Sequence, residues 1–217
     1  MDITPFELER ILDQKLAARA CQNLIGRYLH YLTACRTSDM LALWADDSDT
    51  RVELPWGVYD GKDGVARYLA ELPAHDSEDR KGYLRIQALS TPVFEVAKDL
   101  QTARGAWFSQ GVATEEKEGE SPCRWRWVKL GVDFINVNGE WKLWHMVTHT
   151  LIDTAYDKAW YDQPKLTIES FGDGHTPDRK PTWRTLWNMT EGNPYPTGHP
   201  AVPRPYDNFD LEVGYGY

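Results

Sequence analysis

The sequence predicts an α+β fold in which helices cover one face of an antiparallel sheet. Apolar residues recur at helical spacing through the first third of the 217 residues. Strand-like segments then follow one another to about residue 152, and an Asn138-Gly139 pair marks a tight hairpin between the last two. Helices followed by a run of consecutive strands are typical of an α+β domain.

Three helices are predicted before the main run of strands. The first begins just after Thr4, which is a good N-cap and forms a capping-box pattern with Glu7. Its apolar stripe continues to about Ala34, as one helix or as two in succession. A short second helix is predicted over residues 39–44, and a third over residues 64–72 with an aspartate cap.

Five segments are predicted as strands because they alternate in polarity or lie between turn signals. They are residues 51–54, 92–97, 102–114, 124–137 and 140–152. Residues 57–61 are interpreted as a turn, and the acidic residues 115–121 as an exposed hairpin loop. The sheet is therefore expected to be a long meander preceded by one short strand.

The domain organisation is predicted as a domain of residues 1–152 and a C-terminal extension of residues 153–217. From about Gln163 the chain is rich in Pro and Gly and has no periodicity, yet it carries scattered large aromatics, namely Trp183, Trp187, Tyr195 and Tyr206. Such a segment is either disordered or an irregular arm, and the aromatic content favours the arm. We expect it to pack on the domain or on a neighbouring subunit.

The composition and charge of the chain limit the classes of partner and cofactor that it can be expected to bind. A net charge of −9 without a basic cluster disfavours nucleic acid, and no apolar run is long enough to span a membrane. Three cysteines without a CxxC pair are interpreted as reduced thiols of a cytoplasmic protein. No phosphate-binding glycine loop follows a strand, and no metal-ligand spacing is present, so no cofactor and no metal are expected. Ten tryptophans and eleven tyrosines suit both a core and an apolar ligand pocket.

Several short passages, taken together, indicate a family. They are Leu24-Ile25-Gly26-Arg27-Tyr28, Leu41-Ala42-Leu43-Trp44-Ala45-Asp46-Asp47, Gly57-Val58-Tyr59-Asp60-Gly61, Leu89-Ser90-Thr91-Pro92 and Asn138-Gly139-Glu140-Trp141-Lys142-Leu143. Each is weak alone, but their order and spacing, from about Lys15 to Ile152, resemble the SnoaL-like branch of the nuclear transport factor 2-like superfamily. The resemblance implies a cone: a strongly curved antiparallel sheet closed by the N-terminal helices into an α+β barrel, with a cavity for a small hydrophobic molecule.

The resemblance also implies a chemistry that this chain does not fully match. Dehydratase and dehydrochlorinase members of the family use an Asp/His pair as general base, whereas the corresponding positions here fall on Thr33 and Gln87. Neither a hydroxyl nor an amide accepts a full proton at neutral pH. The tyrosine of the dehydratase pattern is retained as Tyr28.

Candidate site residues follow from the family comparison and from strand alternation. The catalytic candidates are Tyr28, as a donor to an oxygen, and Glu53 or His149, as a proton carrier. The substrate-binding candidates are Thr33, Trp56, Gln87, Trp107, Ser109, Arg126, Trp144, Met146 and Thr148. Arg51 and Thr150 are placed on the cavity side of their strands as well.

Each candidate also has a structural interpretation. Tyr28 could be a tyrosine with a satisfied hydroxyl, and Arg51 with Glu53 could form a structural ion pair. The three tryptophans could belong to the core. A one-residue bulge in the last strand would exchange its two faces, and His149 would reach the cavity only in that event.

Three functions remain open at this stage. The first is a cofactor-free lyase or isomerase, dehydratase-like, acting on a small hydrophobic and cyclic hydroxy or keto compound. The second is a small-molecule binding protein without turnover, which the missing Asp/His pair favours. The third is an assembly protein with a filled core. The three remain open because the fold alone does not fix the chemistry. A homodimer or homotrimer is expected in each case.

Overall fold

The structure is a computed structural model, and it describes residues 3–75, 81–115, 121–172, 174–182, 199–210 and 214–215. The helices are α1 (Pro5–Thr33), α2 (Thr37–Ala42) and α3 (Gly61–Ala70), with short 3-10 turns η2 (Trp160–Asp162) and η3 (Ile168–Phe171). The strands are β1 (Arg51–Leu54), β2 (Gly57–Asp60), β3 (Arg85–Val96), β4 (Thr102–Thr114), β5 (Cys123–Val137) and β6 (Glu140–Ala155).

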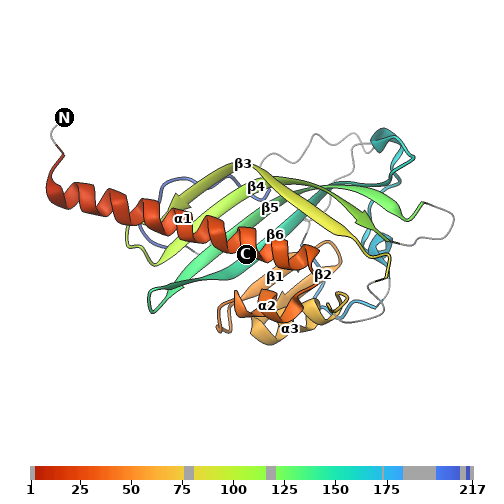
Figure 1. Ribbon diagram of the computed structural model, residues 1–217, viewed down its shortest axis with the longest axis horizontal. Coiled ribbons are helices and arrows are strands. Elements are labelled where there is room, and N and C mark those ends of the chain that lie inside the picture. Colours follow the sequence, from red (N-terminus) through yellow and green to blue (C-terminus); the bar gives the residue numbers. More distant parts are fainter. Residues whose placement is uncertain are drawn as a thin grey trace.

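The six strands form one curved sheet in the order β2-β1-β6-β5-β4-β3 (Figure 1). Neighbouring strands are antiparallel except β1 and β6, which run parallel. The predicted α+β class and curved sheet are confirmed. The sheet is not closed into a barrel, since β2 and β3 form its two edges.

The helices begin and end close to the predicted residues. Thr4 caps α1 through a complete capping box with Glu7, so the N-terminal prediction is confirmed. The helix is a single one and ends at Thr33. Both shorter helices start earlier than predicted, α2 at Thr37 and α3 at Gly61. The early start of α3 follows from its position directly after β2.

Two strand predictions were wrong at their boundaries. Residues 57–60, interpreted as part of a turn, form β2. The strand predicted from Pro92 begins at Arg85 instead, and the register shifts between Ser90 and Val93. A proline is tolerated there because β3 is an edge strand, and Thr91 takes a positive φ of 46° at the irregularity.

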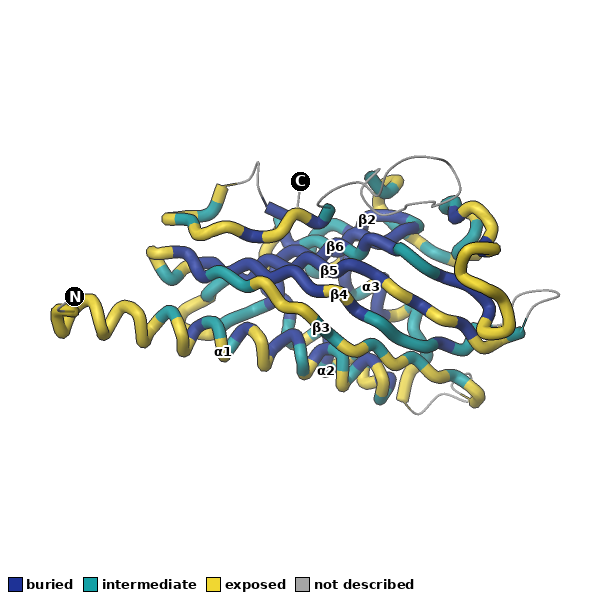
Figure 2. The backbone as a smooth tube through the Cα atoms, turned by 90° about the horizontal axis from the view of Figure 1, so that it is seen from above, coloured by how far each residue is buried: buried dark blue, intermediate teal, exposed yellow. Residues whose placement is uncertain are grey.

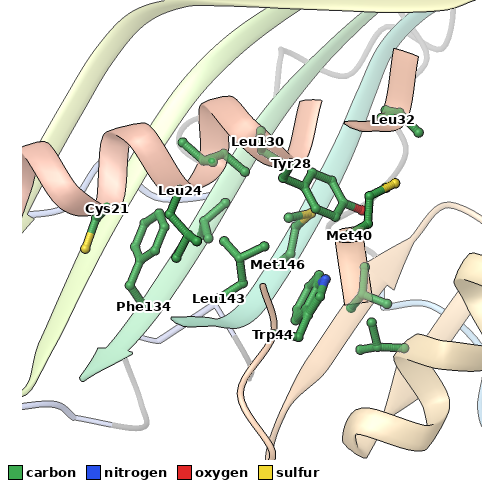
Figure 3. Packing of buried hydrophobic residues seen from close by; sticks show 14 of the residues in the cluster. Cys21, Leu24, Tyr28, Leu32, Met40, Trp44, Leu130, Phe134, Leu143 and Met146 are labelled. Atoms are coloured by element: carbon green, nitrogen blue, oxygen red, sulfur yellow. The ribbon is translucent and has the colours of Figure 1, made fainter. Parts of the chain in front are cut away.

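The core lies between α1 and one face of the sheet, which is called the inner face below. Leu24, Tyr28 and Leu32 project from α1 toward the strands, as Figure 3 shows, and pack with Phe134 and Met146. The first turns of α1 extend past the sheet and are exposed (Figure 2). The buried side chains of α1 therefore lie mainly in the second half of the helix, next to the cavity described below.

Parts of the C-terminal segment lie against the domain. Arg179 forms an isolated β-bridge with Val58 in β2, and the backbone N–H of Tyr215 donates to Asp133 in β5. Residues 183–198, which include Trp183, Trp187 and Tyr195, lie outside the described residues. The division into a domain of residues 1–152 and an extension stays a prediction. In the described part of the chain, no helix has the length and apolarity that crossing a membrane requires.

Candidate functional site

A small cavity lies between α1 and the inner face of the sheet. Its volume is about 30 Å³. Most of its wall is apolar, and the polar part comes from α1, α3 and strands β3, β4 and β6. The polar side chains are Tyr28, Tyr68, Arg85, Gln87, Ser109 and Thr148. We call this space the inner compartment.

Tyr28 projects from the buried face of α1 into this compartment. It is 3% exposed, and its ring packs edge-on against Trp44, 6.1 Å between centroids (Figure 3). Burial raises the pKa of the Tyr28 phenol well above its usual range, and a hydrogen bond with Tyr68 raises it further. Tyr28 is therefore a proton-bearing donor at neutral pH rather than a base.

Two polar atoms at this cavity have no hydrogen-bond partner among the described residues. The Oγ atom of Ser109, on β4, is unpaired although the residue is only 3% exposed. The Nε atom of Arg85, at the start of β3, is also inaccessible and unpaired. Buried donors without partners are rare in folded proteins, so both atoms point to a missing binding partner.

A second space adjoins the first, and Tyr68 and Arg85 line both. This outer compartment has a volume of about 130 Å³. Its walls come from the β1–β2 turn, the end of α3, the start of β3, β5 and the C-terminal segment. The remaining lining residues are Trp56, Glu71, Leu72, Pro73, Tyr83, Glu115, Arg126, Phe171 and His175. The two compartments together lead from the core toward the surface.

His175, from the C-terminal segment, is held firmly in the outer compartment. Its ring stacks on Trp56 with centroids 4.4 Å apart. Its Nδ1 lies 2.8 Å from a carboxylate oxygen of Glu71, and its Nε2 lies 3.2 Å from the carbonyl oxygen of Phe171. Glu71 also accepts hydrogen bonds from the Tyr59 hydroxyl and from Thr176. An imidazole oriented by a carboxylate is an arrangement that supports proton transfer.

An ion-pair network forms the wall beside Arg85. Arg126 pairs with Glu115 at 2.7 Å and with Asp153 at 2.9 Å, and Arg124 pairs with Asp153 at 2.6 Å. The pKa of the Arg85 guanidinium is lowered by burial, but nearby Tyr68, Tyr83 and Glu115 raise it on balance. Arg85 is thus a permanent cation beside a wall whose carboxylates are already paired.

Seven of the predicted binding or catalytic residues lie at these two compartments. Tyr28, Gln87, Ser109, Met146 and Thr148 line the inner one. Trp56 and Arg126 line the outer one. Strand alternation placed Ser109 of β4 and Met146 and Thr148 of β6 on the face that lines the inner compartment.

Glu53 and His149 do not reach the cavity. Leu54 and Thr148 line the inner compartment, so the neighbouring Glu53 and His149 point to the opposite, outer face of the sheet. Both are buried there, and Glu53 accepts a hydrogen bond from the backbone N–H of Thr182 at 2.7 Å. Arg51 shares the outer face with Glu53 and pairs with Asp60.

Three further candidates have structural positions. Trp144 packs on His145 and on Phe209 of the C-terminal segment, because the register shift near it turns its side chain to the outer face. Trp107 belongs to the core beside Phe134. Thr33 is exposed, and its hydroxyl donates to the carbonyl oxygen of Arg85, which fixes the start of β3 to the end of α1.

The sequence interpretation missed Arg85, Tyr68, Glu71 and His175. The signal for Arg85 was an alternation of Tyr83, Arg85, Gln87 and Leu89 against Leu84, Ile86 and Ala88, which extends the strand upstream of the bulge. His175 and Glu71 are 104 positions apart, so no local pattern brings them together. Among the described residues, no group of three or more metal-ligating side chains could hold a metal ion.

Comparison with known proteins identifies the family. A model of the SnoaL-like domain matches residues 14–147. The chain belongs to this family. The match runs from within α1 to the middle of β6 and includes all the residues that line the inner compartment except Thr148, so the predicted resemblance is confirmed. A comparison with curated proteins found no match.

Solved structures agree on the fold. A hexachlorocyclohexane dehydrochlorinase, LinA-type3, from Novosphingobium barchaimii LL02 is 16% identical, with a TM-score of 0.54, over 70% of this chain and 99% of that one. A nuclear transport factor 2-like superfamily protein from Salmonella enterica serovar Typhimurium is 14% identical, with a TM-score of 0.52, over 67% and 98%. A putative scytalone dehydratase from Novosphingobium aromaticivorans DSM 12444 is 17% identical, with a TM-score of 0.50, over 65% and 88%.

Proposed function

We propose that the chain is a cofactor-free lyase or isomerase of the dehydratase type. Its substrate is a small cyclic hydroxy or keto compound. The observation that carries this proposal is the Tyr28 hydroxyl, which is buried and lines the inner compartment together with Tyr68 and Arg85. Preorganised donors in a dry cavity stabilise the negative charge that develops on a substrate oxygen.

The reaction that suits these groups is elimination beside a carbonyl. A base removes the proton from the carbon next to the carbonyl, and negative charge builds on the carbonyl oxygen. The carbon–oxygen bond at the β position then breaks, and the leaving hydroxide takes up a proton and departs as water. Tyr28 and Tyr68 stabilise the enolate oxygen, and the hydroxyl that protonates the leaving group recovers its proton from the protonated base, which closes the cycle.

The base in this proposal is His175 rather than Glu53 or His149, which lie on the other face of the sheet. His175 shares the outer compartment with Arg85 and Tyr68, and Glu71 orients its ring. A carbonyl oxygen only accepts, so Nε2 must leave the Phe171 carbonyl and face the substrate without a proton, in the tautomer whose Nδ1–H donates to Glu71, before it can act as the base. This pair would do the work of the family's Asp/His pair, whose positions here are Thr33 and Gln87.

The test begins with a screen of monocyclic β-hydroxy ketones and β,γ-unsaturated ketones for formation of a conjugated enone, followed by ultraviolet absorbance. With any substrate found, Tyr28→Phe is expected to lower kcat by about 100-fold, the effect of removing one preorganised oxyanion donor. Tyr31→Phe is the matched control, because Tyr31 lies on the same helix but lines neither compartment. Wild-type turnover by the Tyr28→Phe protein would remove Tyr28 from the mechanism.

A second candidate function is binding without turnover. None of the residues that line the inner compartment is a carboxylate or an imidazole, so no base lies at its centre. Mass spectrometry of a bound ligand after incubation separates the two functions, because a binding protein returns the ligand unchanged. The homodimer or homotrimer and the cytoplasmic location stay predictions, and light scattering of the purified chain measures the first.

A further inference from the structure

One guanidinium at the junction of the two compartments has no carboxylate partner among the described residues. Three guanidinium groups lie there, on Arg85, Arg124 and Arg126. Three carboxylates lie near them: Asp153 is paired with both Arg124 and Arg126, Glu115 is paired with Arg126, and Glu71 contacts His175. Arg85 forms no ion pair in the parts of the chain that the structure describes.

The position of Arg85 is fixed from both sides. Thr33 donates to its backbone carbonyl at 3.0 Å, and its side chain forms a hydrogen bond with Tyr83. Its Nε–H remains unpaired and inaccessible. A guanidinium that offers Nε–H and a terminal N–H side by side matches the two oxygens of a carboxylate.

Ser109 gives an independent observation at the same place. Its hydroxyl is buried, unpaired and part of the wall that Arg85 also lines. Tyr28 and Tyr68 add two more hydroxyl donors to that wall. A cluster of donors around a guanidinium that forms no ion pair is complementary to a single oxyanion group.

One side of the outer compartment is apolar, and both compartments are small. Trp56, Leu72, Pro73 and Phe171 form the apolar side of the outer compartment. Volumes of about 30 and 130 Å³ are well below the roughly 300–1,000 Å³ of pockets for drug-sized ligands. A single ring therefore fits better than a fused ring system.

We infer that the ligand of this site is a monocyclic carboxylic acid, with its carboxylate on Arg85 and Ser109 and its ring in the outer compartment. This inference rests on the proposed function in that it specifies the substrate class of the same cavity. Glu71 lies in the outer compartment, so the carboxylate of the ligand points inward, away from that like charge.

The test compares shape-matched ligands that differ only in charge. Benzoate and cyclohexanecarboxylate are titrated against benzamide and cyclohexanecarboxamide, and dissociation constants are measured by ligand-observed NMR. The wild-type chain is expected to bind each acid about tenfold or more tightly than its amide, since charge-assisted hydrogen bonds are about twice as strong as neutral ones. Equal affinity for acid and amide, or no binding of either acid, would overturn the inference.

Variants locate the carboxylate. Arg85→Gln is expected to bring the acid-to-amide affinity ratio close to one, whereas Arg36→Gln, at an exposed arginine paired with Asp39, is expected to leave it unchanged. If Arg85→Gln does not fold, the acid-to-amide affinity ratio is measured for Arg85→Lys and Ser109→Ala instead, because both keep the cavity nearly intact. A full acid preference in both of these would overturn the assignment.

The titration also separates this inference from the proposed function. An acid preference that is lost in Arg85→Gln supports the ligand class, whether or not the ketone screen finds turnover. Turnover of neutral ketones by a chain that shows no acid preference supports the lyase and overturns the ligand class.

Discussion

Asp133 is the residue whose replacement tests the outer face of the sheet most directly. Its carboxylate is fully buried and accepts from Arg104 Nε at 3.1 Å and from the backbone N–H of Tyr215 at 2.6 Å, and it lies 2.9 Å from His145 Nδ1. Asp133→Asn removes the charge while keeping the shape. The Arg104 guanidinium, whose side chain is 5% exposed, would then be left without this carboxylate.

Breaking one side of a buried ion pair costs about 3–5 kcal/mol, because the remaining charge is uncompensated. Domains of this kind are stable by about 5–15 kcal/mol in total, so the loss is about a fifth or more of the free energy of unfolding. We therefore expect a large decrease in the urea midpoint, followed by tryptophan fluorescence. Release of the segment around Tyr215 should accompany it and make the C-terminal end more sensitive to protease.

Asp207→Asn is the matched control. Asp207 pairs with Lys98, but its side chain is 75% exposed, and exposed pairs contribute at most about 1 kcal/mol. A loss of less than about 1 kcal/mol in Asp133→Asn, similar to that of the control, would refute the reasoning that this buried network stabilises the outer face.

Two further predictions concern single side chains. Burial lowers the pKa of the Lys129 ammonium, and no described residue pairs with it. Lys129→Met is therefore expected to raise the free energy of unfolding at neutral pH. The gain should shrink as pH rises through the lowered pKa toward about 10.4, the value of the unfolded chain, and a gain that is constant with pH would contradict this. Cys123 is exposed while Cys21 and Cys35 are buried, and burial raises the pKa of Cys21, so a thiol reagent should label one cysteine in the native chain and three in denaturant.

Local patterns were sufficient to predict much of the inner compartment. Helical spacing placed Tyr28 on the buried face of α1, and alternation placed Ser109, Met146 and Thr148 on the inner face of their strands. These predictions needed only the period of each element. They held because the register of β4 and the middle of β6 is regular at these positions.

The errors arose at residues whose side-chain direction, to the inner or the outer face of the sheet, depends on strand pairing rather than on the alternation of residues along the strand. Glu53 belongs to a four-residue strand that pairs parallel with β6, and nothing in residues 51–54 indicates which side meets the helices. Trp144 lies at a register shift, which exchanges the two faces of β6 on either side of it. Arg85 was missed because the strand was taken to begin at Pro92, beyond the bulge.

The outer compartment depends on contacts that no sequence window contains. His175 meets Glu71 and Trp56 only because residues 175–179 lie along β2 and α3, held by the Arg179 bridge to Val58 and by hydrogen bonds from Asp60 and Arg67 to Asp178. Such contacts depend on the tertiary fold, because residues so far apart in the sequence share no periodic pattern from which their contact could be predicted.

The late position of residues 175–182 has a consequence for how the protein is made and how it changes. A ribosome synthesises all six strands before it reaches His175, so the nascent chain can form the sheet while the entrance of the ligand site is still open. The segment that finishes the entrance contributes no residue to the six-stranded sheet. Substitutions within it alter the shape of the entrance while leaving the sheet in place. The shape and charge of the outer compartment can therefore change by substitution in residues 175–182 while the six strands keep their pairing.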